Sequence, residues 1–335
     1  MELNTISLGD FVRLAGIIFE KEKEGLGQEA RRSGLFIEES IPLQTGNTRE
    51  YTEIDGNEYA KTKGEGDQAA RAKVQQGYSK IMTMKRVAED IGITFEMRTQ
   101  NKYPSVIARL TNLARKGINR LELDLTHRIT FMTSTSYTDM DGLTIDVSMG
   151  NTLALASTVH LVRGSSSTYR NRLAGNPQIS KGALEGMERL VTEETINQFA
   201  EKQVIPFNVL FTSDDPNTVN VARELLQSTA AVDSANAGVK NVYLGKYTHV
   251  RLPRIATDAN GAVDATKRKY WGLASTLYSS AHLGIWEEPR LKVPQDLNAG
   301  EEFSTDDWNF GVRGGYGICI VAGSWIKVST GDGTA

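Results

Sequence analysis

The chain has 335 residues, which is long enough for two domains or for one domain with large excursions. Hydrophobic residues make up 39% and charged residues 24%, an ordinary globular balance with ample material for a core. The formal net charge of −3 argues against a lysine-rich nucleic-acid binder and against a strongly acidic protein.

Cysteine content and the first residues indicate a reducing compartment. Cys319 is the single cysteine, so an internal disulfide is excluded. Residues 1–5 have neither the basic region nor the apolar run of a signal peptide. No apolar stretch approaches the ~20 residues that span a bilayer. We therefore expect a soluble protein that is made in a cytoplasm and has no membrane partner.

Residues 1–34 are predicted to form an N-terminal arm. One amphipathic stretch carries apolar residues at helical spacing: Phe11, Leu14, Ala15, Ile18 and Phe19. A charged tract at 20–24 follows, and the arm has too little apolar surface to fold alone. Two interpretations stay open, a mobile arm and a short helix docked on the rest of the chain.

Residues 35–95 are predicted to form an extended loop. Residues 49–85 have the texture of two extended strands broken at 63–67, and the ends of the loop are more apolar than its middle. A two-stranded hairpin is marginal in water without a third strand or a covering layer. We expect a hairpin rooted in a core, with a far half that packs on another chain. A self-contained surface hairpin is the alternative.

A long helix is predicted from about residue 104 to 126. Its apolar residues recur on one face: Ile107, Leu110, Ala114, Ile118, Leu121 and Leu125. Pro104 suits the first turn, where its missing N–H costs nothing. The opposite face carries a basic ridge that includes Arg109, Lys116 and Arg120. This ridge faces either an enclosed polyanion or only solvent.

The remainder mixes helices and strands without a regular βαβ rhythm. Ser180 and Asp215 are predicted N-caps of two helices, and a buried strand at 206–212 precedes the second. Two polar loops, 229–241 and 256–269, bracket another strand. From residue 270 onward the pattern is all β. The predicted fold class is therefore α+β and not doubly wound.

A search for chemistry assigns no catalytic, cofactor-binding or metal-binding residue. The four histidines stand far apart, and no zinc, phosphate-loop or nucleophile-elbow motif is present. Asp139-x-Asp141-Gly142 resembles the start of a calcium loop, but the glycine comes too early and the closing glutamate is absent. Scattered carboxylates suggest no acid/base pair, so we expect a protein that is not an enzyme and needs no cofactor.

The order of these parts resembles the major capsid proteins of tailed phages with the Hong Kong 97-type fold, closest to the Mu-type major head subunit branch. Five segments carry the resemblance: TDMDGLTIDVSMGNTLALASTVH (138–160), NRLAGNPQISKGALEGMERL (171–190), PFNVLFTSDDPNTVNVARELLQS (206–228), KYWGLAS (269–275) and DWNFGVRGGYGICIVAGSWIKVS (307–329). The sequence departs from the branch pattern at Ala156-Ser157 and at His160-Leu161.

The resemblance implies an architecture and a function. Residues 96–150 and 301–335 would form a peripheral domain around a spine helix at about 104–126, and residues 151–300 an axial domain. The subunit would assemble into hexamers and pentamers of an icosahedral shell around phage double-stranded DNA, held weakly. No coiled-coil segment precedes the arm, so a separate scaffolding protein is implied, with a portal and an optional decoration protein as further partners. The chain would be made in the host cytoplasm and reside in the virion.

In this interpretation the extended loop lies over the adjacent subunit. The expected inter-subunit contacts are Arg49, Tyr51, Glu53, Ile54, Glu58, Tyr59, Lys61, Arg71, Lys73 and Val74. Mixed charge would set register while the apolar members provide anchors. Arg109, Lys116 and Arg120 would face the DNA. The alternatives are a bacterial nanocompartment shell of the same fold and an α+β enzyme that carries a long hairpin.

Overall fold

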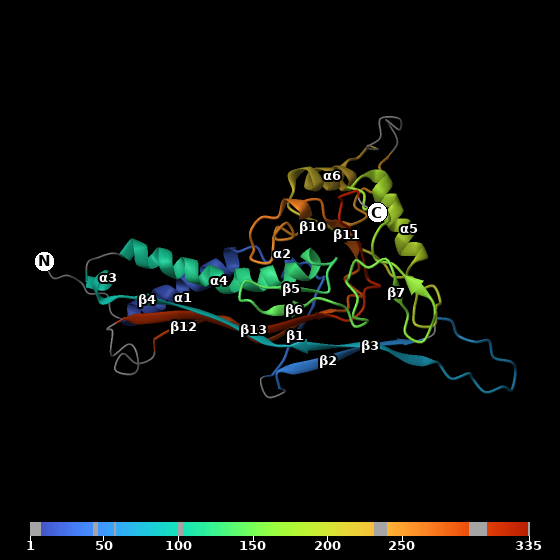
Figure 1. Cartoon of the computed structure of the whole chain (residues 1–335), viewed down its shortest axis with the longest axis horizontal. Coiled ribbons are helices and arrows are strands. Elements are labelled where there is room, and N and C mark those ends of the chain that lie inside the picture. Colours follow the sequence, from blue (N-terminus) through green and yellow to red (C-terminus); the bar gives the residue numbers. More distant parts are fainter. Residues whose placement is uncertain are drawn as a thin grey trace.

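The computed structural model describes residues 8–42, 46–56, 58–99, 103–230, 240–294 and 307–333. Its fold class is α+β, which confirms the prediction. Figure 1 shows three parts: an elongated body, a lobe at one end of the body, and a two-stranded ribbon that extends past the lobe.

The body is a long four-stranded sheet with helices along one side. Its strand order is β1 (Ile37–Ser40), β12 (Ala281–Lys292), β13 (Trp308–Ile320) and β4 (Lys85–Ile93). β13 is antiparallel to both of its neighbours, whereas β1 is parallel to β12. Helix α4 (Tyr103–Thr130) runs along this sheet, and the short α3 (Phe95–Thr99) precedes it (Figure 1).

Helix α4 confirms the predicted long helix, and it continues to Thr130 instead of ending near residue 126. The inward residues of the prediction are buried, except for Ile107, which is 40% exposed. Val106 is fully buried in its place. Adjacent helical positions point about 100° apart, so a buried stripe that starts at Val106 and Leu110 leaves Ile107 outside.

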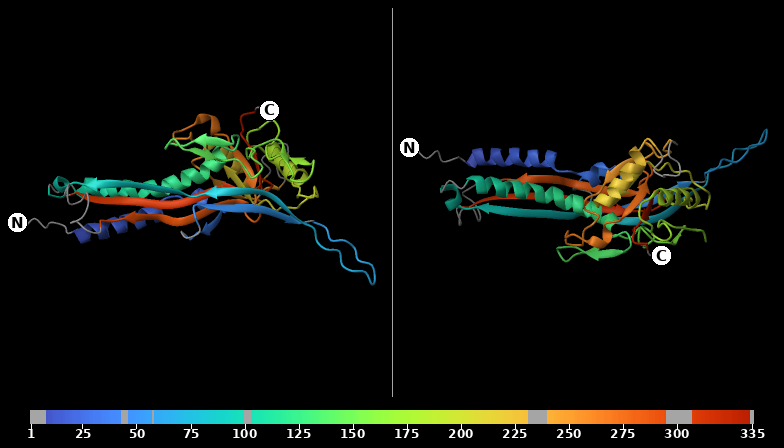
Figure 2. Two further views of the ribbon diagram at one scale, coloured as in Figure 1. Left: turned by 60° about the horizontal axis from the view of Figure 1, so that its bottom comes forward. Right: turned by 90° about the horizontal axis from the view of Figure 1, so that it is seen from above.

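The N-terminal stretch is a docked helix, the second of the two open interpretations. Helix α1 (Leu8–Gly25) lies alongside α4 (Figure 2), and α2 (Glu29–Arg32) follows it. Phe11, Ala15 and Phe19 are buried against α4 and β13, with the rings of Phe11 and Trp308 5.1 Å apart. Residues 1–7 lie outside the described residues.

The lobe contains a second four-stranded sheet. Its strands are ordered β10 (Thr248–Arg251), β9 (Val209–Thr212), β11 (Trp271–Ala274) and β14 (Ile326–Ser329). Helices α5 (Lys181–Glu193) and α6 (Pro216–Gln227) pack on it through a buried apolar cluster. Three small elements complete the lobe and its junction with the body: hairpin β5 (Ser136–Thr138) with β6 (Thr144–Asp146), hairpin β7 (His160–Leu161) with β8 (Thr168–Tyr169), and the 3-10 turn η3 (Ala265–Lys267).

Both predicted N-caps of the lobe helices are confirmed. The Ser180 hydroxyl accepts a hydrogen bond from the Ala183 N–H, and the Asp215 carboxylate accepts one from the Thr218 N–H. Each cap satisfies a backbone donor that has no partner within the helix. Pro216 occupies the first turn of α6, as expected.

Strand pairing moves two segments across the predicted boundaries of the axial domain, 151–300, and the peripheral domain, 96–150 with 301–335. β12 pairs with β13 and therefore belongs to the sheet of the body. β14 pairs with β11 and therefore belongs to the sheet of the lobe. The local residue pattern identifies each segment as a strand. Its pairing partner lies far away in the sequence and is determined by which surfaces become buried, and the local pattern does not contain that information.

The ribbon consists of β2 (Thr48–Gly56), β3 (Val74–Thr83) and the tip between them. Among the described residues, β2 and β3 pair with each other and with no further strand. Residues 60–73 of the tip form no helix or strand and are all exposed. Figure 2 shows the tip reaching beyond the lobe, which confirms a hairpin that is rooted in a core and projects at its far end.

Candidate subunit interface

The register of β2 and β3 gives the ribbon two distinct faces. Side chains of paired residues in an antiparallel ladder point to the same side, and successive pairs alternate. One face carries the pairs Arg49–Met82, Tyr51–Lys80 and Asp55–Gln75, together with Glu53; we call it the inward face. The other carries Thr48–Thr83, Glu50–Ile81, Thr52–Ser79, Ile54–Gln76 and Gly56–Val74; we call it the outward face.

Near its root, the inward face is bound to the body. The ring of Tyr51 stacks on His282 with centroids 4.0 Å apart, and its hydroxyl donates to Glu39 at 3.0 Å. Burial raises the pKa of Tyr51, and the bond to the Glu39 carboxylate adds to the shift. Arg49 forms an ion pair with the same Glu39 at 3.2 Å.

Lys80 extends this contact toward the hairpin β5–β6. Its ammonium lies 2.5 Å from the Asp146 carboxylate and donates to Ser148 at 2.8 Å. Ion pairing with Lys80 and hydrogen bonds from Ser148 outweigh burial and lower the pKa of Asp146. The inward lysine of the ribbon is therefore already paired within its own chain.

Farther out, the inward face is bound to the lobe. The Gln198 N–H donates to Asp55 at 3.1 Å, and the Asn197 side chain donates to the Gly56 carbonyl at 3.2 Å. The Gln75 side chain donates to the Arg163 carbonyl at 3.1 Å. These bonds hold the ribbon against the lobe up to the base of the tip.

Glu53 is a largely buried carboxyl in this contact. It lies beneath the Gln198 amide and beside Gly77, where an added Cβ would lie 2.4 Å from the Glu53 Oε2. Burial raises the pKa of Glu53, and the nearby Asp55 carboxylate raises it further. The neutral form of this carboxyl is therefore more favoured than it would be in water.

The outward face is open and almost uncharged. Ile54, Val74 and Ile81 are 71%, 68% and 60% exposed, and Glu50 is the single formally charged residue in its five pairs. Apolar side chains this exposed on one face of a thin sheet commonly mark a contact surface. The predicted contact residues Ile54 and Val74 lie on this face.

The structure thus separates the ten predicted contact residues into three groups. Arg49, Tyr51 and Glu53 are on the inward face and bind their own chain. The exposed Glu58 and Tyr59 follow β2 and contact lobe residues: the Glu58 N–H donates to Glu201 at 2.7 Å and the Tyr59 hydroxyl lies 3.5 Å from the Lys202 carbonyl. The exposed outward face and tip carry the others: Ile54, Lys61, Arg71, Lys73 and Val74. Contact with a neighbouring subunit stays a prediction for all ten.

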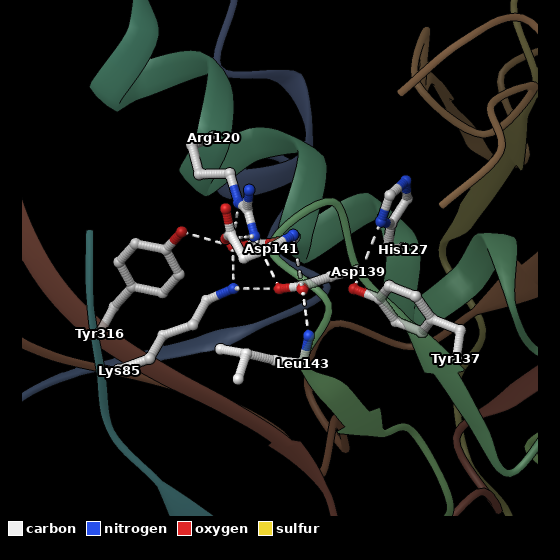
Figure 3. Close-up of polar contacts among 9 residues, drawn as sticks. Lys85, Arg120, His127, Tyr137, Asp139, Asp141, Leu143 and Tyr316 are labelled. Carbon is white, nitrogen blue, oxygen red and sulfur yellow. Dashed lines mark hydrogen bonds and ion pairs between the residues drawn. The ribbon is translucent and has the colours of Figure 1, made fainter. Parts of the chain in front are cut away.

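A buried charge cluster fixes the root of β4 to α4 (Figure 3). The Lys85 ammonium lies 2.6 Å from Asp124, whose carboxylate also accepts from the Tyr316 hydroxyl at 2.5 Å. Arg120 pairs with Asp139 at 2.8 Å and with Asp141 at 2.9 Å. The cluster joins the body sheet, the long helix and the turn between β5 and β6 at the point where the ribbon meets the body.

His127 lies next to this cluster and is neutral at neutral pH. Burial lowers the pKa of its ring to about 4. One ring nitrogen lies 3.3 Å from the Tyr137 hydroxyl (Figure 3), and the other lies 3.2 Å from the Thr257 hydroxyl. The arrangement is that of a hydrogen-bonded core histidine.

The sequence reasoning missed this cluster, although two local signals point to it. Asp139 was compared with a calcium loop, but its Oδ1 accepts the N–H groups of Asp141 and Leu143, and its other oxygen binds Arg120. Asp139 therefore shapes a turn, in which Gly142 supplies the positive φ of 77°. The i, i+4 spacing of Arg120 and Asp124 is the second signal.

The three residues of the basic ridge are in different electrostatic states. Arg109 is exposed. Lys116 is exposed and paired with Glu89, while Arg120 is half-buried and bound by the carboxylates of the cluster. Lys116 and Arg120 line a cleft of about 720 Å³ between α4 and the turn at 139–143. Lys116 and Arg120 therefore both have carboxylate partners within the chain, and contact of this ridge with DNA stays a prediction.

Neither a metal-binding cluster nor a membrane-spanning helix occurs in the part of the chain that the structure describes. There, no group of three or more His, Cys, Asp or Glu residues is arranged to hold a metal ion. Within the same residues, no helix has the length and apolarity to cross a bilayer.

Comparisons with known proteins give structural likeness alone. No protein-family model matches the sequence, and no curated protein matches it. The chain is similar to the capsid of Myoviridae phage XM1, with 9% identity over 89% of this chain and 90% of that chain and a TM-score of 0.49. It is also similar to a virus-like particle from Pyrococcus furiosus (10% identity, 95% and 97% covered, TM-score 0.47) and to the mature capsid of bacteriophage PhiM1 (11%, 88% and 85%, 0.48). At these scores the likeness does not assign the chain to a family.

Proposed function

We propose that this chain is the major head subunit of a tailed phage, with a Hong Kong 97-type fold, and that it assembles into a closed icosahedral shell. The proposal rests on the architecture of the chain itself, a docked arm, a projecting ribbon, a long helix on a sheet, and a lobe with polar loops. The Mu-type branch remains a prediction from the sequence patterns.

The single observation that carries the proposal is the ribbon. Its inward face is occupied by its own chain, its outward face is open, and its exposed tip extends past the lobe (Figure 1). A two-stranded sheet gains little stability alone. In a shell, every ribbon would lie on an adjacent subunit, and many weak contacts would add up because each subunit is held by several neighbours at once.

The lobe would form the contacts around the five- and six-fold axes of pentamers and hexamers. The loop proposed for the centre is either 229–241 or 256–269. Residues 231–239 lie outside the described residues. The second loop is described, and it exposes Val263 at 77%.

The shell would enclose double-stranded DNA and bind it weakly. The net charge of −3 suits a container that must not hold the polymer tightly. Arg109 and Lys116 are the proposed lumen-facing cations, with Arg120 contributing less because of its carboxylate partners. A separate scaffolding protein, a portal and an optional decoration protein complete the proposed partners.

Removal of the tip tests the proposal. Replacing residues 61–72 by a two-residue Asn-Gly turn retains β2, β3 and every inward contact. We expect a folded subunit with an unchanged melting temperature that forms no closed particles by negative-stain electron microscopy, whereas the unaltered chain forms particles of uniform diameter. Normal particles from the shortened variant would overturn the role given to the ribbon tip, and an unaltered chain that sediments only as a monomer would overturn the proposal of a shell subunit.

A nanocompartment of the same fold is the second candidate. The same contacts would build it, and its content would differ. Nucleic acid extracted from purified particles identifies a phage head, whereas an enclosed protein identifies a nanocompartment.

A further inference from the structure

We infer that the open edge of β4, together with the cleft beside it, binds an extended segment of a different protein. The segment would add a strand to the body sheet next to β4, and it would carry a carboxylate between small apolar side chains. The surface lies on the body, away from the ribbon, and the inference does not depend on whether the chain builds a shell.

The backbone of β4 has one side without a strand partner. β4 is the last strand of the body sheet, and among the described residues it pairs with β13 alone. In an antiparallel strand, every second residue directs its N–H and C=O away from the partner. The Met84 N–H donates to Asn47, which precedes β2, whereas the Glu89 carbonyl oxygen lies beside Gly311 of β13. Even-numbered residues of β4 therefore direct their N–H groups away from β13: Arg86, Ala88, Asp90 and Gly92.

The open edge of β4 continues a row that β2 occupies farther along the chain. β3 ends at Thr83 and β4 begins at Lys85, so the two strands follow one another almost directly. β2 pairs with β3 as far as the pair Thr48–Thr83, and no described strand continues this row beside β4. Unpaired edges of this kind take up strands from other chains. An added strand would occupy the row that β2 leaves vacant.

A cleft of about 720 Å³ opens along the same edge. Four consecutive residues of β4, 86–89, line it. Successive side chains of a strand point to opposite faces, so this lining places the cleft at the edge of the strand, along about 13 Å. Helix α4, the turn at 139–143 and the loop at 254–261 form the other walls, and Figure 2 shows hairpin β5–β6 beside the edge. The volume is that of an ordinary ligand site.

The cleft combines apolar side chains with an excess of cations. Met140 and Leu143 are 45% and 56% exposed, and Leu123 lines the cleft with them. Small apolar side chains of an added strand would contact these residues on the α4 side of the sheet. Four lining residues are cationic and two are anionic: Arg86, Lys116, Arg120 and Arg254, against Glu89 and Asp141. The balance favours a partner that carries negative charge.

Arg254 is the cation that we assign to the carboxylate of the partner. Its guanidinium donates to the Asn119 side chain at 2.8 Å and lies 3.9 Å from Glu122. The two oxygens of Glu122 already accept the N–H groups of Ala30 and Arg31. The charge of Arg254 is therefore only loosely compensated within the chain. A carboxylate that enters the cleft can form the charge-assisted hydrogen bonds that arginine favours.

A proline on the edge tests the inference in the unassembled subunit. The probe is a fluorescent, acetylated peptide of seven residues in which valine and threonine alternate around a central glutamate. We expect saturable binding below about 1 mM. Ala88→Pro removes one outward N–H, which an edge strand tolerates, and should weaken binding about tenfold. The control Ala88→Thr retains the N–H and should bind as the unaltered chain does. Absence of saturable binding, or equal binding by the two variants, would overturn the inference.

The charge of the peptide gives a second measurement. A peptide with lysine in place of the glutamate should bind severalfold more weakly. Arg254→Gln should abolish the difference between the two peptides, whereas Arg109→Gln, at an exposed position of α4, should preserve it. Equal affinities of the two peptides for the unaltered chain would overturn the assignment of a carboxylate.

Hydrogen exchange distinguishes the other possible occupants of the edge. In the unassembled subunit the amides of Ala88 and Asp90 should exchange rapidly, and the glutamate peptide should protect them. Protection without the peptide would show that the chain itself covers the edge. If Ala88→Pro abolished particle assembly and the unaltered subunit bound no peptide, a second copy would be the occupant. Either result would overturn the inference.

Discussion

The lobe and the ribbon are built on opposite principles. In the lobe, all four residues of β9 and all four of β11 are buried, and α5 and α6 cover the sheet. In the ribbon, the tip is exposed throughout and one face of the strands is open. The lobe is stable through its own core, whereas the ribbon depends on contacts with whatever lies beside it. An element with so little core of its own is expected to acquire its order from neighbours.

The root of the ribbon combines core packing, as in the lobe, with contacts to neighbouring segments. Met82 and Met84 are buried in a small apolar cluster with Ile41, Cys319 and Val321. Glycines at 284 and 317 allow the two methionines to approach the body sheet closely. The ribbon is therefore fixed at one end by packing and along its inward face by polar contacts. Four changes test the difference in stability between the lobe and the ribbon, from the largest expected effect to the smallest.

Truncation in the lobe core should be far more costly than truncation in the ribbon. Trp271 is fully buried in the cluster under α5 and α6, and Trp271→Ala is expected to reduce the free energy of unfolding by about 4 kcal/mol. Ile54→Ala on the outward face should change it by less than about 0.5 kcal/mol in the free subunit. Urea unfolding of the unassembled subunit measures both. An equal loss of unfolding free energy in the two variants would show that the lobe core and the outward face of the ribbon do not differ in this way.

Breaking the charge cluster should release the root of the ribbon. Asp124 is 4% exposed and binds Lys85, Arg120 and Tyr316. Asp124→Asn leaves buried cations undercompensated and should cost about 3 kcal/mol.

The matched control for this change is Asp141→Asn. Asp141 pairs with the same Arg120, but its side chain is 59% exposed, so the expected loss is about 0.5 kcal/mol. Urea unfolding gives both values, and hydrogen exchange at residues 84–90 shows whether the loss is local. An equal cost for the two variants would show that burial does not govern the cluster.

A methyl group under the ribbon root should displace it. A Cβ at Gly317 would lie 2.9 Å from the Met82 Cγ and 2.9 Å from the Thr83 carbonyl oxygen, and the backbone atom cannot give way easily. Gly317→Ala is expected to cost about 2 kcal/mol. Gly186→Ala is the control in α5, where the new Cβ meets a leucine at an ordinary 3.7 Å; it should stabilise by about 0.5 kcal/mol. Thermal unfolding that ranks the two variants in reverse order would refute close packing at the root.

The smallest expected effect is the pH dependence of the contact between ribbon and lobe. Burial raises the folded-state pKa of Glu53 above its unfolded value. Its contribution to stability is therefore fully present below the unfolded pKa and is lost as the pH rises through the raised folded pKa. Amide protection in β2, corrected for intrinsic exchange, should fall over that interval. Glu53→Gln should remove the pH dependence, whereas Glu50→Gln on the outward face should retain it.

Local sequence information was sufficient for most of the individual elements. The presence of the long helix α4, the caps at Ser180 and Asp215, and the projecting hairpin all follow from periodicity, capping and turn chemistry between residues close in sequence. The predicted buried face of α4 was correct except at Ile107, because the buried stripe starts one residue earlier, at Val106. The motif that starts at Asp139 could be recognised in the sequence. That Asp139 shapes a turn and binds Arg120 could not be predicted from it.

Tertiary structure decided which surfaces are free. The sequence by itself determined that the ribbon is two polar strands and that the chain is α+β. Only the fold assigned β12 to the body and β14 to the lobe, because strand pairing joins segments far apart in sequence. Only the fold shows that Tyr51 and Lys80 contact their own chain on the inward face, whereas Ile54 and Val74 are exposed on the outward face. Alternation along a strand shows that two faces exist, whereas the structure around the strand determines which of them is already occupied.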